Sequence, residues 1–215
     1  MKLVAISVGR PQEVQWRGRS VQTCILKTAV SHRVHVTNEN IEGDQQSDLS
    51  VHGGPEKAVY AYPAEHYEFW RRGMPDAELA WGAFGENFTT EGLLEDDVWI
   101  GDRYRVGTTE LVVTQPRMPC YKLAIRFGQT EMVKRFLESR RSGFYLAVER
   151  EGDVGAGDAI ERLARSERRL TVADVVALYA ADSANQSLLE SASEHPSLPA
   201  AWREYFRKRL WAPDA

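Results

Sequence analysis

One segment of the sequence combines residue types that could do chemistry: TQPRMPCYKL, residues 114–123. Its two prolines fix φ, remove backbone donors and restrict the residues before them, so a stiff, non-helical connector is expected over residues 115–119. The connector delivers Cys120 between the cations Arg117 and Lys122, which would lower the pKa of the thiol. A thiolate is a nucleophile and a ligand for soft metals. A small buried hydrophobe is the alternative role of Cys120, and these residues alone leave both open.

Two other short segments offer side chains that could hold an anion. Lys27 and Thr28 lie where a predicted strand ends, and such a pair can hold a phosphate or be solvated. The turn FGENFTTEG, residues 84–92, contains Asn87 among short, orientable donors. Donors of this type recognise phosphates or heterocycles, and a tight turn between strands is the alternative.

A long polar loop, residues 38–56, carries a histidine beside two glycines and a proline. Loops of this length in a compact domain are usually functional or disordered, and the glycines could bring backbone close to a ligand. Asp48, four residues before His52, could orient that imidazole for proton transfer. The alternative is that both side chains bond the loop to itself.

Composition limits the class of protein. The 215 residues suffice for one large domain or one domain with a small appendage, and 43% hydrophobic with 27% charged residues is typical of a soluble globular chain. The net charge of −4 gives no reason to expect a nucleic-acid partner. Two distant cysteines do not form a zinc or iron–sulfur spacing, and no P-loop motif occurs. The apolar run near the amino terminus is too short for a signal peptide or membrane span, so a cytoplasmic location without membrane attachment is expected.

The elements that must position these side chains follow from the hydrophobic pattern, which predicts a mainly β chain with helices, an α+β fold. Strands are predicted at residues 2–8, 20–26, 33–37, 57–61, 98–100, 102–106, 109–115, 143–149 and 159–163. Helices are predicted at residues 63–72 and 130–140. Repeated short strands with frequent turns are typical of a partly closed β-barrel carrying a few helices.

The composition changes after the last predicted strand. Three further helices are predicted at residues 171–181, 183–193 and 199–210. Thr171 and Asp174 form a capping-box start for the first of them. We therefore predict a β-barrel domain over residues 1–165 and a small three-helix domain over residues 166–215, the latter an interaction module or a lid.

Taken together, these motifs resemble the MOSC superfamily, the domain shared with molybdenum-cofactor sulfurases and amidoxime-reducing enzymes. The resemblance is closest to the YiiM-like subgroup linked to hydroxylaminopurine resistance. It covers nearly the whole chain in matching order, through DLSVHGGPEKAVYAYPAEHYEFW, GAFGENFTTEG, GDRYRVG, QPRMPCYKL, GFYLAVEREGDVGAGD and the three-helix tail.

The resemblance implies a mostly β barrel in which Cys120 is the protein ligand to molybdenum, because the QPRxPC context is intact. The pterin and phosphate of a molybdenum cofactor need cations and short polar donors. The candidates that this sequence supplies are Lys27, Thr28, His52, Asn87, Arg117 and Lys122. At the level of the superfamily, pyridoxal phosphate binding is a further association.

The implied activity is reduction of N-hydroxylated nucleobases and related hydroxylamines. Cleaving N–OH to N–H and water needs two electrons and two protons, and the pair Asp48 and His52 could act as general acid. The chain lacks the cysteines of an iron–sulfur cluster and a GxGxxG fingerprint, so electrons must come from a partner flavoprotein or iron–sulfur protein. The oligomeric state stays open, with a homodimer as one option.

Two rival functions use the same cysteine. A molybdenum-cofactor or sulfur carrier would hold a persulfide on Cys120 without reductase turnover. A cofactor-free cysteine hydrolase would use Cys120 with His52 and Asp48.

Overall fold

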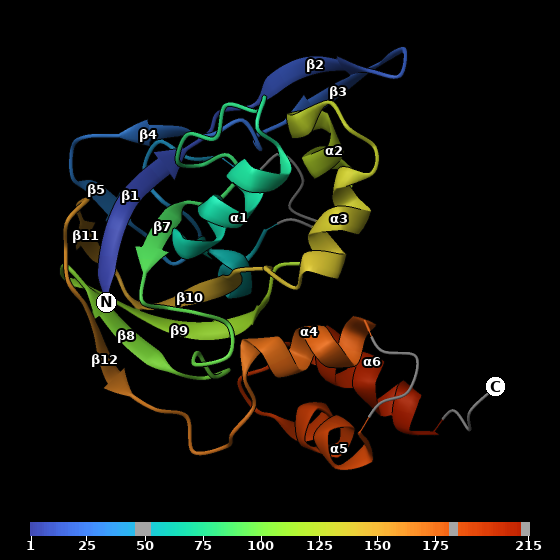
Figure 1. The fold of residues 1–215 in the computed structure, drawn as a ribbon. Coiled ribbons are helices and arrows are strands. Elements are labelled where there is room, and N and C mark those ends of the chain that lie inside the picture. The colour runs from blue at the N-terminus through green and yellow to red at the C-terminus, as the bar shows by residue number, and fades with distance from the viewer. Residues whose placement is uncertain (46–52, 181–184, 212–215) are drawn as a thin grey trace.

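A computed structural model of the chain describes residues 1–45, 53–180 and 185–211. Within these residues the fold is mixed α+β, with one large sheet, two small two-stranded sheets and six α-helices (Figure 1). The α+β class predicted from the sequence is thereby confirmed. None of the helices described is long and apolar enough to cross a membrane.

The large sheet has eight strands and is antiparallel except between β6 and β7. In spatial order its strands are β12 (Ile160–Ala164), β8 (Arg103–Val106), β9 (Thr109–Pro116), β10 (Phe144–Arg150), β6 (Val59–Pro63), β7 (Phe88–Glu91), β1 (Lys2–Val8) and β4 (Thr28–Val30). Lys2 forms an isolated bridge with Ala159, which brings β1 close to the start of β12. No continuous ladder joins the two ends of the sheet in the described residues, so the sheet is open and the partly closed barrel is not confirmed.

Two separate strand pairs, one of them a hairpin, lie outside this sheet. The first joins β2 (Gln12–Trp16) to β3 (Arg19–Thr23), and it projects at the upper right of Figure 1. Arg17 and Gly18 both have positive φ in its two-residue turn, the conformation that suits the twist of such hairpins. The second pairs β5 (Val34–Val36) with β11 (Gly152–Val154).

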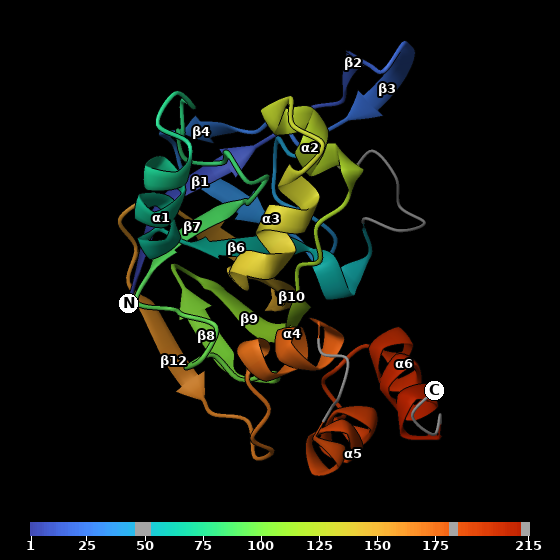
Figure 2. The ribbon, with the colours of Figure 1, turned by 45° about the vertical axis from the view of Figure 1, so that its right-hand side comes forward.

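Three helices and the 3₁₀ turn η1 (Pro55–Lys57) cover one side of the sheet: α1 (Glu65–Gly73), α2 (Tyr121–Phe127) and α3 (Met132–Ser139) (Figure 2). Between them lies a buried aromatic cluster. Trp70 stacks on Phe136 at 5.9 Å between ring centres, and Tyr62 packs against Phe84 at 4.8 Å. The Trp70 Nε1 donates to the Tyr62 hydroxyl at 2.7 Å, so the one polar group of each ring is satisfied.

The carboxyl-terminal helices are α4 (Val172–Ala180), α5 (Gln186–Glu194) and α6 (Ala200–Trp211). The predicted capping box at the start of α4 is confirmed, because Thr171 N donates to Asp174 Oδ2 and Asp174 N to Thr171 Oγ1, each at 2.9 Å. Val175 and Phe206 of this tail belong to the same buried hydrophobic cluster as Leu111 of β9. The domain boundary at residues 165 and 166 remains a prediction.

Some predicted elements differ from the structure. The strand predicted at 98–100 is a turn in which Trp99 forms only an isolated bridge with Thr171. The segment 84–92, predicted as a turn, ends in strand β7, which is buried between β1 and β6. Helix α2 is not among the predicted elements, although Leu123, Ala124 and Phe127 have helical spacing.

Candidate functional site

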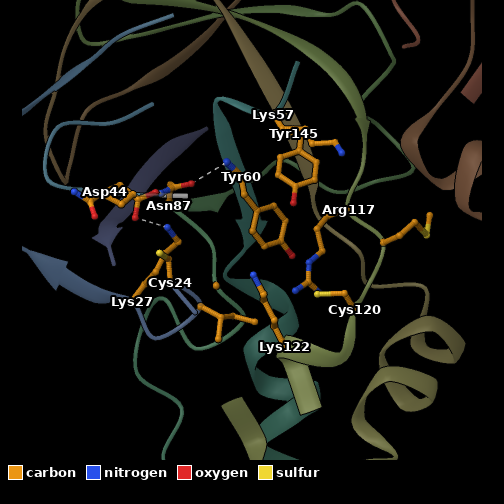
Figure 3. A pocket seen from close by; sticks show the side chains of 14 residues that line it. Cys24, Lys27, Asp44, Lys57, Tyr60, Asn87, Arg117, Cys120, Lys122 and Tyr145 are labelled. Carbon is orange, nitrogen blue, oxygen red and sulfur yellow. Dashed lines mark hydrogen bonds and ion pairs between the residues drawn. The ribbon is translucent and has the colours of Figure 1, made fainter. Parts of the chain in front are cut away.

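Cys120 lines a cavity of about 110 Å³ between β6, β10, the segment after β3 and the start of α2 (Figure 3). Met118 and Gln45 contribute further parts of its wall. The cavity brings together two thiols, four cationic side chains and two tyrosines: Cys24, Cys120, Lys27, Lys57, Arg117, Lys122, Tyr60 and Tyr145. This set is electropositive and contains a soft ligand, the two properties expected of the site.

The connector that holds Cys120 is fixed at both ends. Strand β9 continues to Pro116, which lies opposite Phe144 of β10, and Arg117 N then donates to Gly143 O at 3.3 Å. Cys120 has extended φ and ψ of −123° and 173° and precedes the first turn of α2, where Leu123 N donates to its carbonyl at 2.9 Å. The predicted stiff connector is therefore irregular over residues 117–120 and half-buries the thiol.

A buried histidine–glutamate pair supports this connector through the backbone of Gly143. His66 Nε2 lies 2.7 Å from Glu95 Oε2, and both side chains are buried. The other carboxylate oxygen of Glu95 accepts a 2.7 Å hydrogen bond from Gly143 N. Because Gly143 O accepts a hydrogen bond from Arg117 N, the His66–Glu95 pair positions the backbone that carries Arg117.

Arg117 is buried, with 5% of its surface exposed, and its guanidinium faces the cavity. Its Cζ lies 5.5 Å from the ring centre of Tyr60 and 5.1 Å from that of Phe136. Its Nη1 is buried and has no hydrogen-bond partner among the described residues. Burial alone would lower the pKa of Arg117, but the ionisable Tyr60, Tyr145 and Cys120 around it raise that pKa above its usual value. Arg117 therefore places a permanent positive charge in the cavity wall, with one N–H group that meets no acceptor in the described residues.

The opposite wall is organised by Asp44, a residue that the sequence did not single out. Asp44 accepts hydrogen bonds from Lys27 Nζ, from Gly9 N at 2.6 Å and from Asn87 Nδ2 at 2.9 Å. Asn87 Oδ1 in turn accepts from Tyr60 N at 3.1 Å. The amide of Asn87 therefore braces the wall, and Lys27 reaches the cavity as half of an ion pair.

Two tyrosines form the inner surface of the cavity. Their ring centres lie 5.4 Å apart, and the hydroxyl of Tyr60 donates to Ser142 O at 2.8 Å. Burial raises the pKa of Tyr60 well above its usual value and also raises the pKa of Tyr145, against the lowering effect of Arg117. Both hydroxyls therefore keep their protons at neutral pH.

Five of the predicted site residues meet at this cavity: Lys27, Asn87, Arg117, Cys120 and Lys122. Thr28 lies exposed on β4 and is not among the lining residues. Asp48 and His52 lie outside the described residues.

Sequence reasoning missed several residues of the site. Lys57 and Tyr60 both fall in the segment KAVYA, which predicted a strand but carried no chemical motif. Tyr145 likewise fell within a predicted strand. Cys24 is buried as predicted, but it follows β3 and lines the cavity, so this second thiol belongs to the site as well as to the packing.

The class of the protein follows from two matching family models, one for the sheet region and one for the helical tail. Residues 48–161 match the MOSC domain, and the chain belongs to the MOSC domain family. Residues 170–211 match the YiiM-like, 3-alpha helix domain, so the chain is a YiiM-like member of that family.

Individual relatives agree with this assignment. The chain is 39% identical over 207 residues to the uncharacterized protein YflK of Bacillus subtilis, covering 96% of this chain and 93% of YflK. It superposes on the crystal structure of YiiM from Geobacillus stearothermophilus with a TM-score of 0.82 at 36% identity, covering 97% and 98% of the two chains. A protein of Gibberella moniliformis named reductase is 32% identical over 182 residues, which are 83% of this chain and 32% of that protein.

Proposed function

We propose that this protein is a molybdenum-cofactor-dependent reductase of N-hydroxylated compounds, such as hydroxylaminopurine-type base analogues and hydroxylamines. The observation that carries the proposal is the pairing of the Cys120 thiol with the buried Arg117 in one cavity. Membership of the MOSC family and the name of the fungal relative support it.

The residues present fit such a cofactor. A thiolate suits a molybdenum whose other ligands are a dithiolene and oxygen, and no group of three or more His, Cys, Asp or Glu that could hold a metal unaided occurs in the described part of the chain. The buried Nη1 of Arg117 has no hydrogen-bond acceptor in the part of the chain that the structure describes, and an anionic oxygen would provide one. Lys57 and Lys122 add positive charge to the same cavity.

Each side chain then has a defined task. Cys120 would hold the metal, and Arg117, Lys57 and Lys122 would bind the anionic groups of the cofactor. Lys27 is fixed by Asp44 and contributes its charge from the opposite wall. When bound, the cofactor supplies a metal that exchanges two electrons, which is the number needed to reduce N–OH to N–H and water. Asp48 and His52 remain the proposed proton donors, and the electrons would come from a partner flavoprotein or iron–sulfur protein.

A carrier of sulfur without reductase turnover is the second candidate. The cavity of about 110 Å³ in the described residues is smaller than the roughly 300–1,000 Å³ of ordinary small-molecule sites, which favours a small guest on Cys120. Mass spectrometry distinguishes the two candidates. A persulfide would add about 32 Da, one sulfur atom, to the peptide that contains Cys120.

The reductase is tested with protein purified from a host that makes the molybdenum cofactor. Reduced methyl viologen serves as electron donor, 6-hydroxylaminopurine as substrate, and adenine is quantified. We expect turnover by the wild type and a loss of more than about 100-fold in Cys120→Ser, since losing outer-shell partners of a metal alone costs about 10–100-fold. Equal turnover by both proteins would refute the proposal.

A further inference from the structure

The carboxyl-terminal helices carry an aromatic cluster that reaches from the protein interior to its surface. Tyr179 of α4 contacts Trp202 and Tyr205 of α6, each with 5.7 Å between ring centres, and Trp202 lies 5.6 Å from Phe206. Phe206 is fully buried, whereas Tyr179 and Tyr205 are 39% and 37% exposed. The cluster is therefore continuous from core to solvent.

This cluster is joined to the candidate site by one hydrogen bond. Trp202 Nε1 donates to Gln115 Oε1 at 2.8 Å, and Gln115 is buried near the end of β9. Gln115 pairs with Tyr145 of β10, a lining residue of the Cys120 cavity, and lies two residues before Arg117. Figure 2 shows α4 beneath β9 and β10, with α6 beside α4. The tail thus touches the strand pair that forms one wall of the cavity.

The exposed end of the cluster is bordered by positive charge. Helix α6 contains four basic residues and one acidic residue, although the whole chain has a net charge of −4. Arg209 Cζ lies 5.9 Å from the ring centre of Tyr205. On the outer face of α6, Glu204 pairs with both Arg207 and Lys208, whose side chains are 51% and 76% exposed, so one positive charge remains in excess there.

We propose that the exposed face of α6 around Tyr205 and Lys208 is the docking surface for a small acidic electron-carrier protein. The Trp202–Gln115 contact is the route by which its electrons reach the Cys120 cavity. A basic surface steers an acidic partner and fixes its orientation, mainly through the association rate and its salt dependence. This inference rests on the proposed reductase function and names the surface that serves it.

The electron balance defines the type of partner. Reducing one N–OH bond breaks the N–O bond and consumes two electrons and two protons, giving N–H and water. A carrier that delivers one electron at a time must dock twice per turnover and leaves oxidised each time. Acidic flavodoxins and [2Fe–2S] ferredoxins have the charge and the redox chemistry required.

Binding of the carrier tests the surface without requiring turnover. Purified flavodoxin and [2Fe–2S] ferredoxin are titrated onto the full-length protein by calorimetry at low and high ionic strength. We expect binding that weakens with salt and that falls about tenfold or more in Arg207→Glu/Lys208→Glu. The matched control is Arg72→Glu/Lys134→Glu, which reverses the charges of one exposed arginine and one exposed lysine on α1 and α3 and should bind like the wild type.

Three binding results would overturn the proposal. They are absence of binding by both carriers, equal weakening in the two double variants, and selective binding of a DNA duplex of similar charge in place of the carriers.

Electron delivery tests the route. Trp202→Phe keeps a ring in the cluster but removes the donor to Gln115. The rate of electron delivery from bound carrier should fall several-fold in this variant, while carrier affinity and turnover with reduced methyl viologen stay as in the wild type. Unchanged delivery in Trp202→Phe would overturn the route. Failure of viologen-driven turnover in the wild type would instead refute the reductase function, and the calorimetry would still decide the docking surface.

Discussion

The guanidinium carbon of Arg117 lies 5.5 Å from the centre of the Tyr60 ring, inside the protein and beside the thiol of Cys120. A buried arginine is costly to desolvate when no carboxylate pairs with it, and among the described residues Arg117 is surrounded by the Tyr60 and Phe136 rings, by Tyr145 and by Cys120 instead. Its Nη1 has no acceptor among the described residues. This arrangement stabilises the fold little and is suited to receive an anion.

Replacing this arginine should therefore separate stability from binding. Arg117→Met removes the buried charge at similar length, so the free energy of unfolding of protein without cofactor should change by no more than about 1 kcal/mol. The molybdenum retained on purification should fall roughly tenfold or more, because a hydrogen bond to a charged group is worth about 1.5–3 kcal/mol. Urea denaturation and elemental analysis measure the two quantities.

Two outcomes would contradict this role of Arg117. One is a large loss of stability with unchanged metal content, which would make it a structural residue. The other is no change in either quantity. Arg105→Met, at a half-buried arginine on β8 that does not line the cavity, controls for loss of positive charge in general.

Asp44 should be essential to the fold of the opposite wall. In Asp44→Asn the side chain of Lys27, which is 8% exposed, loses its charge partner inside the protein. Breaking a buried ion pair by removing one partner typically costs about 3–5 kcal/mol, and we expect a loss of that order in the free energy of unfolding.

The double variant Asp44→Asn/Lys27→Met tests whether the cost comes from the unpaired lysine. It removes both charges and should recover much of the stability lost in Asp44→Asn. If the double variant is as unstable as the single one, loss of the ion pair is not the cause. The lost stability would then come from the Asp44 oxygens that accept hydrogen bonds from Gly9 N and Asn87 Nδ2.

The sequence predicted most of the elements because their hydrophobic patterns are local. Strand β9 and helix α3 begin and end within two residues of the predicted ranges. Strand β7 escaped prediction because its residues Phe88, Thr89 and Thr90 are buried by β1 and β6, which are distant in sequence. Whether the sheet closes depends on pairing between its first and last strands, and no local sequence pattern indicates such pairing.

The residues of the site could likewise be predicted only where they lie close together in the sequence. Cys120, Arg117 and Lys122 share one segment of chain, so a single motif identified them. Asp44 and Tyr145 carry no motif and join the site only through the fold, which packs the loop after β5 and strand β10 around the same cavity.

His195 makes stability depend on pH. It is fully buried after α5, where Nε2 contacts Arg168 O at 3.3 Å and Nδ1 has no hydrogen-bond partner in the described structure. Burial, together with the nearby charge of Arg168, lowers the pKa of His195 below the usual value of 6.5 for a histidine. The unfolded chain therefore takes up a proton at this residue before the folded protein does.

The stability contribution of neutral His195 should consequently be complete above about pH 6.5, fall as the pH drops below that value, and level off below the lowered pKa of the folded state. Urea denaturation at several pH values, compared with His195→Gln, isolates this effect. Parallel curves for the two proteins over the whole range would disprove it.

Truncation tests whether the tail can be separated from the sheet. The hydrophobic cluster that contains Leu111 of β9 continues into Val172, Val175 and Phe206, so removing residues 166–215 would expose apolar surface of the sheet. We expect the fragment 1–165 to bind a hydrophobic dye and to lose cooperative thermal unfolding. A monomeric, cooperatively unfolding fragment would instead support two independent domains.

The most direct test of the account is the molybdenum content of Cys120→Ala compared with Cys24→Ala, both made in a host that synthesises the cofactor. The two cysteines line the same cavity, so the comparison controls for loss of a thiol and for disturbance of the wall. We predict that the wild type and Cys24→Ala contain molybdenum while Cys120→Ala is nearly devoid of it. Equal molybdenum in both variants, or none in the wild type, would contradict the assignment of Cys120 as the metal ligand.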